Sequence, residues 1–226
     1  MHGGHAETPS IGVGADRLFK QAMETRTAPI QSQLPVAAVV ITHDVEDYTV
    51  WKRAFDGHAA VRRNAGIVAA HVNQDAENPN RVRVYLAGTD RAKLAAFVGD
   101  IALMAAMREA GVTGPPHIVD MTPVEDLIRK DRPLAGLIIR HEVRDYAAWK
   151  RAFDGHGDAR AKAGVIGHAV NRSVRNPNLV VIYLQAESLA ALRAFAVAPD
   201  LKAVMAAAGV VGAPDLSFVH GGEWQS

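Results

Sequence analysis

The sequence predicts an α+β protein built from two copies of one unit. The main observation is an internal repeat: His43 to His58 reads HDVEDYTVWKRAFDGH, and His141 to His156 reads HEVRDYAAWKRAFDGH. Twelve of these sixteen positions are identical, at an offset of 98 residues (141 minus 43). Such self-similarity at a constant offset indicates one folding unit duplicated in tandem.

The repeat also predicts the domain boundaries within the 226 residues. We expect repeat 1 at residues 35–122 and repeat 2 at residues 134–226, joined by a charged, proline-bounded linker at 123–133. Residues 1–34 belong to neither copy and form an N-terminal extension, part of which is expected to be flexible.

The first half of each repeat reads as strand, helix, strand. In repeat 1 the apolar run at residues 36–42 predicts a buried strand. Asp44 and Glu46 mark the start of an amphipathic helix that runs to about Ala65, where Gly66 ends it. A second strand follows at residues 67–73.

The second half reads as strand, helix, strand. The turn signal Asn78-Pro79-Asn80 predicts a hairpin into a third strand at 81–87. Residues 90–110 predict a helix and residues 116–121 a last strand. Repeat 2 follows at the constant offset, except that Pro199 predicts a break in its second helix.

The resulting order, β-α-β-β-α-β, is that of a ferredoxin-like unit with helices on one sheet face only. In the third strand, Val82, Val84 and Leu86 are expected to face the helices, and Arg83 and Tyr85 the other side. The bare faces of the two sheets should therefore pack together as an intrachain α+β barrel with a pseudo-twofold axis. This pseudo-dimer needs no second copy to close, while further homo-oligomerisation through outer surfaces stays open.

Composition excludes several classes of function. A net charge of +1 gives no basis for binding nucleic acid or an anionic membrane. The chain has no cysteine, which excludes disulfides, thiolate nucleophiles and cysteine-based metal sites. It has no apolar run of membrane-spanning length and no signal-peptide pattern, which predicts a soluble cytoplasmic protein. It also lacks zinc-protease and glycine-rich nucleotide motifs, so no metal and no cofactor are expected.

The motif D-Y-x-x-W-K-R-A-F-D-G-H, followed by A-G, N-P-N and A-G-V-x-G, resembles the dimeric α+β barrel superfamily. Within it, the chain is most similar to small antibiotic biosynthesis monooxygenase-like proteins, some of them labelled cyclases. The resemblance covers residues 36–121 and 134–220. It implies a barrel that binds a small molecule, as a cofactor-independent monooxygenase or cyclase acting on an aromatic or polyketide-like substrate.

The same resemblance leaves two alternatives open. One is a haem-binding or haem-degrading protein in which a histidine is the axial ligand. The other is a non-catalytic binding or stress-associated protein in which the shared motif is structural.

The motif helix carries the main candidate site. The spacing of 3, 4, 3 and 4 residues places five side chains of each copy on one helix face. They are Tyr48, Trp51, Phe55, His58 and Arg62 in repeat 1, and Tyr146, Trp149, Phe153, His156 and Arg160 in repeat 2. The aromatic residues are candidates for substrate binding, and His58 and His156 for acid–base catalysis, in a pocket between helix and sheet. The alternative is an aromatic core with a histidine at the helix end.

Other polar residues give further expectations. His43 and His141, at the end of the first strand, are candidate catalytic groups or anchors of the strand–helix turn. Asp47 and Asp145 could orient them or stabilise the first helical turn. The basic residues of the motif helices are expected to be solvated: Lys52, Arg53, Arg62 and Arg63, and their copies Lys150, Arg151 and Arg160.

His71 and His168 break the symmetry between the repeats, because the offset of 98 aligns them with Ala169 and Ala70. Adjacent strand residues face opposite sides of a sheet. One histidine should therefore point into the barrel and the other toward the helices, and the two halves should differ in function.

Overall fold

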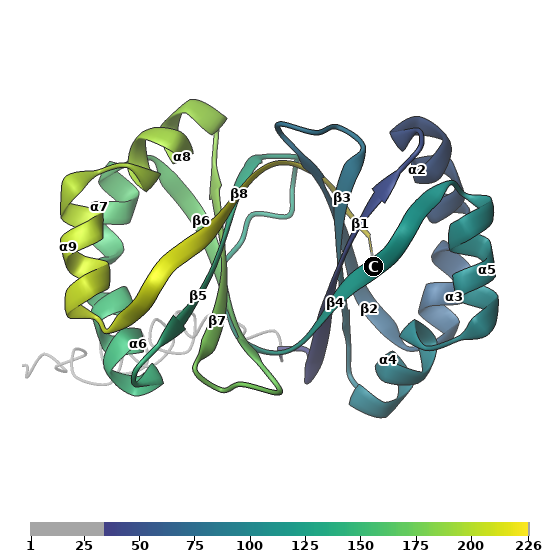
Figure 1. Ribbon diagram of the computed structural model, residues 1–226, viewed down its shortest axis with the longest axis horizontal. Helices are drawn as coiled ribbons and strands as arrows, with labels where there is room; N and C mark the ends of the chain where they lie inside the picture. Colours follow the sequence, from purple (N-terminus) through teal and green to yellow (C-terminus); the bar gives the residue numbers. More distant parts are fainter. Residues whose placement is uncertain (1–33, 226) are drawn as a thin grey trace, which may run out of the picture. The chain divides into compact units, whose positions relative to one another are not determined.

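The computed structural model describes residues 34–225, so the prediction for the N-terminal extension lies outside the described residues. Both repeats have the predicted element order (Figure 1). Repeat 1 comprises β1 (Ala37–Val45), α2 (Tyr48–Gly57), α3 (Ala59–Asn64), β2 (Ile67–Asp75), β3 (Arg81–Gly88), α4 (Arg91–Val98), α5 (Ile101–Glu109) and β4 (Val112–Asp126). Repeat 2 comprises β5 (Ala135–Val143), α6 (Tyr146–Gly155), α7 (Gly157–Lys162), β6 (Val165–Ser173), β7 (Leu179–Ala186), α8 (Leu189–Ala196), α9 (Pro199–Ala207) and β8 (Val210–Gln225).

Each predicted helix is in fact two helices. The Asp47 side chain caps α2 by accepting a hydrogen bond from the Val50 amide at 2.9 Å. α2 ends at Gly57, and α3 starts beyond His58; glycine is a poor helix former, which favours an end here. The break at Pro199 is confirmed, and repeat 1 has its own break at Asp100, which caps α5.

The eight strands form a closed antiparallel barrel in the order β1-β3-β2-β8-β5-β7-β6-β4. Helices α2 to α5 cover one outer side and α6 to α9 the opposite one (Figure 1). The predicted intrachain barrel, closed by the two sheets facing each other, is confirmed.

Two long strands join the repeats. The first part of β4 pairs with β1 of its own repeat, and residues 121–126 then pair with residues 169–173 of β6. β8 likewise pairs with a strand of the other repeat, because its residues 219–225 pair with residues 70–75 of β2. β4 therefore runs to Asp126, into residues that the sequence assigned to the linker. Its pairing with β6 explains the difference, since a partner strand supplies the hydrogen bonds that an exposed linker would lack.

The core has three parts. Trp51 and Trp149, each 3 % exposed, pack with the helix-facing strand residues in one apolar cluster per repeat. Val82, Val84 and Leu86 belong to the first of these clusters, as predicted. A third cluster fills the middle of the barrel around Met121 and Val181, with Tyr85 packed against it. Tyr85 thus lies on the barrel side, also as predicted.

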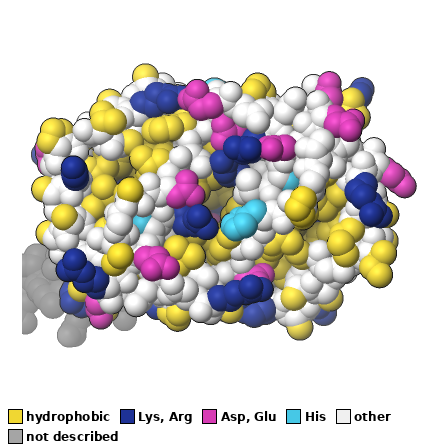
Figure 2. Space-filling view, viewed as in Figure 1, with side chains coloured by type: hydrophobic (Ala, Val, Ile, Leu, Met, Phe, Trp, Pro, Cys, Tyr) yellow, Lys and Arg dark blue, Asp and Glu magenta, His cyan; other side chains and the backbone are white. Residues whose placement is uncertain are grey.

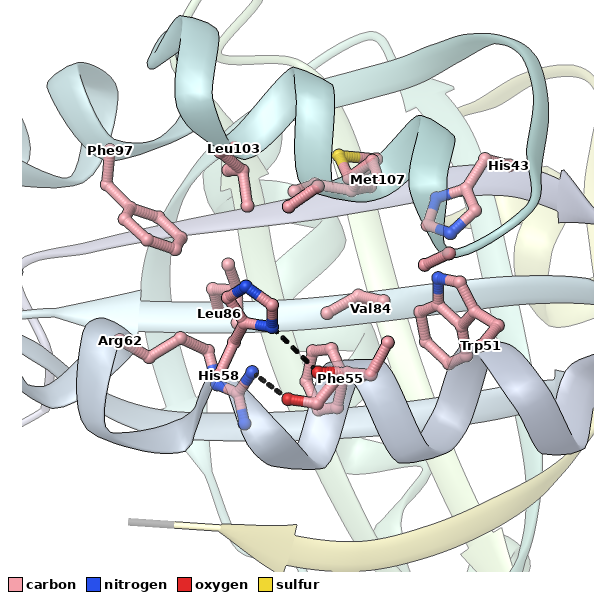
Figure 3. A pocket seen from close by; sticks show the side chains of 14 residues that line it. His43, Trp51, Phe55, His58, Arg62, Val84, Leu86, Phe97, Leu103 and Met107 are labelled. Atoms are coloured by element: carbon pink, nitrogen blue, oxygen red, sulfur yellow. Dashed lines mark hydrogen bonds between the residues drawn. The ribbon is translucent and has the colours of Figure 1, made fainter.

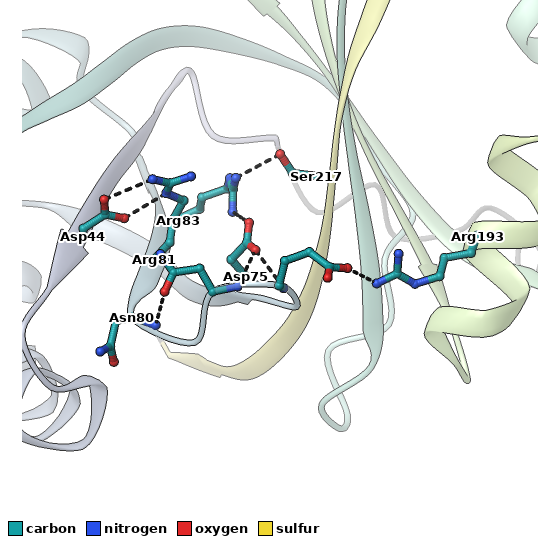
Figure 4. A network of polar contacts seen from close by, with 9 residues as sticks. Asp44, Asp75, Asn80, Arg81, Arg83, Arg193 and Ser217 are labelled. Carbon is teal, nitrogen blue, oxygen red and sulfur yellow. Dashed lines mark hydrogen bonds and ion pairs between the residues drawn. The ribbon is translucent and has the colours of Figure 1, made fainter.

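Polar contacts tie the β2–β3 hairpin to repeat 2 (Figure 4). Arg83 of β3 pairs with Asp75 at 2.7 Å and donates a hydrogen bond to the Ser217 hydroxyl of β8 at 2.9 Å. Arg193 of α8 pairs with Glu77 in the hairpin turn. Within residues 34–225, none of the helices has the length and apolar character needed to cross a membrane.

Candidate functional site

Each repeat contains a small cavity between its helices and the barrel sheet. The repeat-1 cavity has a volume of about 70 Å³, and the repeat-2 cavity about 50 Å³. The predicted residues Trp51, Phe55 and His58 line the first, together with His43 (Figure 3). Their copies Trp149, Phe153, His156 and His141 line the second. The remaining wall of the repeat-1 cavity is apolar apart from Arg62; it includes Ile41, Val84, Leu86, Phe97, Leu103 and Met107.

His43 lies on the helix-facing side of β1, edge-on to Trp51 with ring centroids 5.4 Å apart. It is 5 % exposed, and within residues 34–225 neither ring nitrogen has a hydrogen-bond partner. Burial lowers the pKa of His43 from 6.5 to about 4, against a smaller opposing effect of Asp44. His141 repeats this arrangement, and burial also lowers its pKa to about 4. Both imidazoles are therefore neutral near pH 7.

His58 lies between α2 and α3, where its backbone closes one helix and opens the next. Its Nδ1 lies 2.8 Å from the Ala54 carbonyl oxygen. Because a carbonyl only accepts, Nδ1 carries the proton in the neutral ring, and Nε2 keeps a free lone pair. In the described part of the chain His156 makes no such side-chain hydrogen bond. The two repeats thus hold their histidines differently.

Arg62 corrects one prediction, since it is buried rather than solvated. It is 5 % exposed, and its guanidinium lies 3.8 Å from the centre of the Phe55 ring. It donates to the Phe55 carbonyl at 2.6 Å and to the Gln225 side chain at 2.5 Å. Arg160 is likewise buried, over Phe153. The 3, 4, 3, 4 spacing did indicate that Arg62 and Arg160 are buried, because it placed both arginines on the aromatic face of their helices.

Two predicted substrate-binding residues lie outside the cavities. Tyr48 packs on Trp51 with ring centroids 6.0 Å apart, but it does not line the repeat-1 cavity. Tyr146 packs on Trp149 and lies under the Arg172 guanidinium.

Asp47 and Asp145 do not orient the strand histidines. Each caps its helix instead, Asp145 by accepting a hydrogen bond from the Ala148 amide at 2.6 Å. The first-turn interpretation of these two residues is therefore the correct one.

His71 and His168 lie on opposite sides of the sheet, as predicted. His71 points into the barrel, where it stacks on Trp224 with ring centroids 4.2 Å apart. His168 lies on the helix side, against Phe153 and 3.3 Å from a Glu125 oxygen.

A larger hollow of about 460 Å³ lies at one end of the barrel and is lined by residues of both repeats. Its three arginines are paired with acids: Arg81 with Asp44, Arg83 with Asp75, and Arg140 with Asp215 at 3.3 Å. In Figure 2, basic and acidic side chains gather around a hollow near the middle of the face in view. Because each of these guanidinium groups already has a carboxylate partner, none of the three is a free cation for a ligand.

The described residues contain no group of three or more His, Cys, Asp or Glu side chains that could hold a metal ion. The polar side chains that line the repeat-1 cavity are the imidazoles of His43 and His58 and the guanidinium of Arg62.

Comparison with known proteins finds no matching family model and no matching curated sequence. Solved structures do match. A "putative monooxygenase" from Lactobacillus acidophilus is 13% identical with a TM-score of 0.62, over 86% of this chain and 97% of that one. An anthrone oxidase-like protein is 15% identical with a TM-score of 0.61, over 84% and 92%. A ferredoxin-fold protein related to antibiotic biosynthesis monooxygenases, from Listeria monocytogenes, is 10% identical with a TM-score of 0.51, over 82% and 94%.

At these identities the likeness is one of fold. The first two alignments cover 86% and 84% of this chain, which is more than either repeat contains, so each alignment spans both halves of the barrel. The chain therefore has the fold of the dimeric α+β barrel superfamily, with both halves of the barrel in one polypeptide.

Proposed function

We propose that the repeat-1 cavity binds an aromatic or polyketide-like molecule with an acidic carbon, and that His58 removes a proton from that carbon. The observation that carries the proposal is the hydrogen bond from His58 Nδ1 to the Ala54 carbonyl. It leaves Nε2 as a proton acceptor in a cavity with largely apolar walls. A general base must have a free lone pair within reach of the substrate.

His43 has a different role in this proposal. Its low pKa makes it a poor proton acceptor but keeps it neutral, with one N–H to donate. Its nitrogens have no partner among the residues that the structure describes, so a substrate oxygen can take that hydrogen bond. A donor aimed at the oxygen of a forming enolate stabilises the charge that deprotonation creates.

The carbanion then reacts without a cofactor. In an oxygenase it reduces O2 and forms a hydroperoxide at the same carbon, and loss of water leaves a carbonyl. In a cyclase it attacks a carbonyl carbon of the same molecule. In both reactions the protein supplies the base, the donor and the exclusion of water.

Binding requires the cavity to enlarge. Its volume of about 70 Å³ is below the roughly 150 Å³ that accommodates benzene. The outer wall is α5, which contributes Leu103 and Met107 and has no fully buried residue. An element with little buried surface opens at low cost, and methionine adapts its shape to a ligand. We expect α5 to move outward when substrate binds.

The experiment compares His58→Gln with its matched control His156→Gln. Oxygen consumption is measured with anthrone, a tricyclic ketone that has an acidic methylene. His58→Gln should lower the rate by about 10²–10⁴-fold, with little change in His156→Gln.

Equal rates in all three proteins would contradict the role of His58. Absence of both turnover and binding, across a set of acidic-carbon ketones, would favour the non-catalytic alternative. A Soret band in the purified protein would favour the haem alternative.

A further inference from the structure

Another cavity lies inside the barrel, on the other side of the sheet from the repeat-1 and repeat-2 cavities. This barrel cavity has a volume of about 50 Å³, enough for a molecule of a few non-hydrogen atoms. Residues of both repeats line it, including His71, Asn73 and Tyr85 from repeat 1, and Asn171 and Tyr183 from repeat 2. It therefore exists only where the two sheets meet.

Two buried asparagine side chains face this cavity, each with a carboxamide oxygen that lacks a described partner. Asn73 on β2 is 4 % exposed, and its pseudo-symmetry mate Asn171 on β6 is 5 % exposed. The Oδ1 atom of each has no hydrogen-bond partner among the described residues. Buried polar atoms are almost always hydrogen-bonded, so these two indicate a partner other than the residues that the structure describes.

Further unpaired groups complete the wall. His71 is 2 % exposed, and its Nε2 lies 3.0 Å from the Gly222 carbonyl, to which it must donate; its Nδ1 is therefore an acceptor. The Tyr183 hydroxyl and the Trp224 indole N–H are buried donors without partners in the described part of the molecule. The wall thus offers both donors and acceptors.

Both carboxylates among the described lining residues form ion pairs. Of its two carboxylates, Glu125 lies 2.9 Å from Lys150, and Asp126 lies 2.7 Å from Lys130. Burial lowers the pKa of His71 to about 4, which keeps the ring neutral, and raises the pKa of Tyr183. An ion entering this cavity would lose its hydration without gaining a free counter-charge.

We propose that the barrel cavity is a ligand site for a small neutral molecule, or the end of a larger one, that carries a carboxamide. A carboxamide has one acceptor and one donor side by side. It can therefore form two reciprocal hydrogen bonds with an asparagine side chain, and the second asparagine and Tyr183 take its remaining positions. The site is independent of the chemistry in the repeat-1 cavity.

The wall is asymmetric, which gives the ligand one orientation. His71 aligns with Ala169, and Trp224 aligns with Asp126 at the offset of 98. The stacked pair of His71 and Trp224 therefore occurs once, at one end of the cavity.

Three isosteric probes test the proposal: acetamide, acetate and acetamidinium, which have the same shape and differ in charge. The chain has three tryptophans, so its indole ¹⁵N–¹H spectrum has three signals, and Trp224→Phe identifies that of Trp224. Acetamide should shift the Trp224 signal saturably, while Trp51 and Trp149 stay unchanged. Acetate and acetamidinium should bind at least about tenfold more weakly.

Variants of the two asparagines give a second test of the proposal. Asn73→Leu and Asn171→Leu should each weaken the binding of acetamide at least about tenfold. Asn64→Leu, at an exposed position of α3, should leave acetamide binding unchanged. If circular dichroism shows a leucine variant to be unfolded, Asn73→Ser and Asn171→Ser replace it, since serine cannot form the two reciprocal bonds. No acetamide-dependent shift, equal shifts from all three probes, or undiminished binding in the asparagine variants would each overturn the proposal.

Discussion

Three buried histidines should make the protein unstable in mild acid. His43, His71 and His141 are 5 %, 2 % and 5 % exposed, and burial lowers the pKa of each from 6.5 to about 4. Between these two values the unfolded chain binds protons that the folded chain does not. Stability is therefore complete above about pH 6.5 and decreases as the pH falls toward 4.

The size of the effect follows from the same values. At pH 5, a site whose pKa moves from 6.5 to about 4 on folding loses about 2 kcal/mol of stability. The three sites together lose about 6 kcal/mol, which is comparable with the roughly 5–15 kcal/mol that stabilises a whole domain. We therefore expect extensive unfolding near pH 5.

The assay is urea unfolding at pH 7 and at pH 5, followed by circular dichroism. His141→Leu removes one buried site from the repeat-2 cavity, so its loss of stability between the two pH values should be smaller than the wild-type loss by about 2 kcal/mol. His220→Gln removes an exposed imidazole and should leave the wild-type loss unchanged. An equal loss in His141→Leu and the wild type would refute the argument from burial.

Two further predictions concern packing. Gly136→Ala should destabilise the protein by about 1–3 kcal/mol, because a Cβ there would lie 2.5 Å from the Tyr183 ring. The control Gly57→Ala, where a Cβ would have nothing within 4 Å, should be neutral or stabilising. Equal urea midpoints for the two variants would argue against a close approach of Gly136 to Tyr183. Arg62→Met should cost more stability than Arg160→Met by about 1 kcal/mol, because Arg62 alone also bonds Gln225; the reverse order in thermal unfolding would show that the Gln225 contact contributes little.

The sequence predicted the fold because its signals were local or repeated. The gapless offset identified two equal units, and the alternation of Val82, Val84 and Leu86 identified the sheet face toward the helices. The extension of β4 beyond Met121 gave no comparable signal. Residues 122–126 read T-P-V-E-D, and their strand character depends on β6, more than forty residues further along the chain.

The candidate site was predicted in outline for a similar reason. Helical spacing grouped Trp51, Phe55 and His58 on one face, and they do line one cavity. Burial of Arg62 depends on Gln225, 163 residues away, which no local pattern reveals. The positions of Asn73 and Asn171 were equally hidden, since a strand end beside a turn accommodates asparagine for purely structural reasons.

The crossing of β4 and β8 between the repeats has a consequence for how the barrel responds to dilution. In a barrel assembled from two separate chains, the β2–β8 and β4–β6 pairings would form by association, and folding would weaken as the protein is diluted. Here both pairings form within one polypeptide, and residues 127–134 hold the halves together at a fixed effective concentration. The barrel, and any ligand site at its centre, therefore keeps the same stability at the lowest protein concentrations.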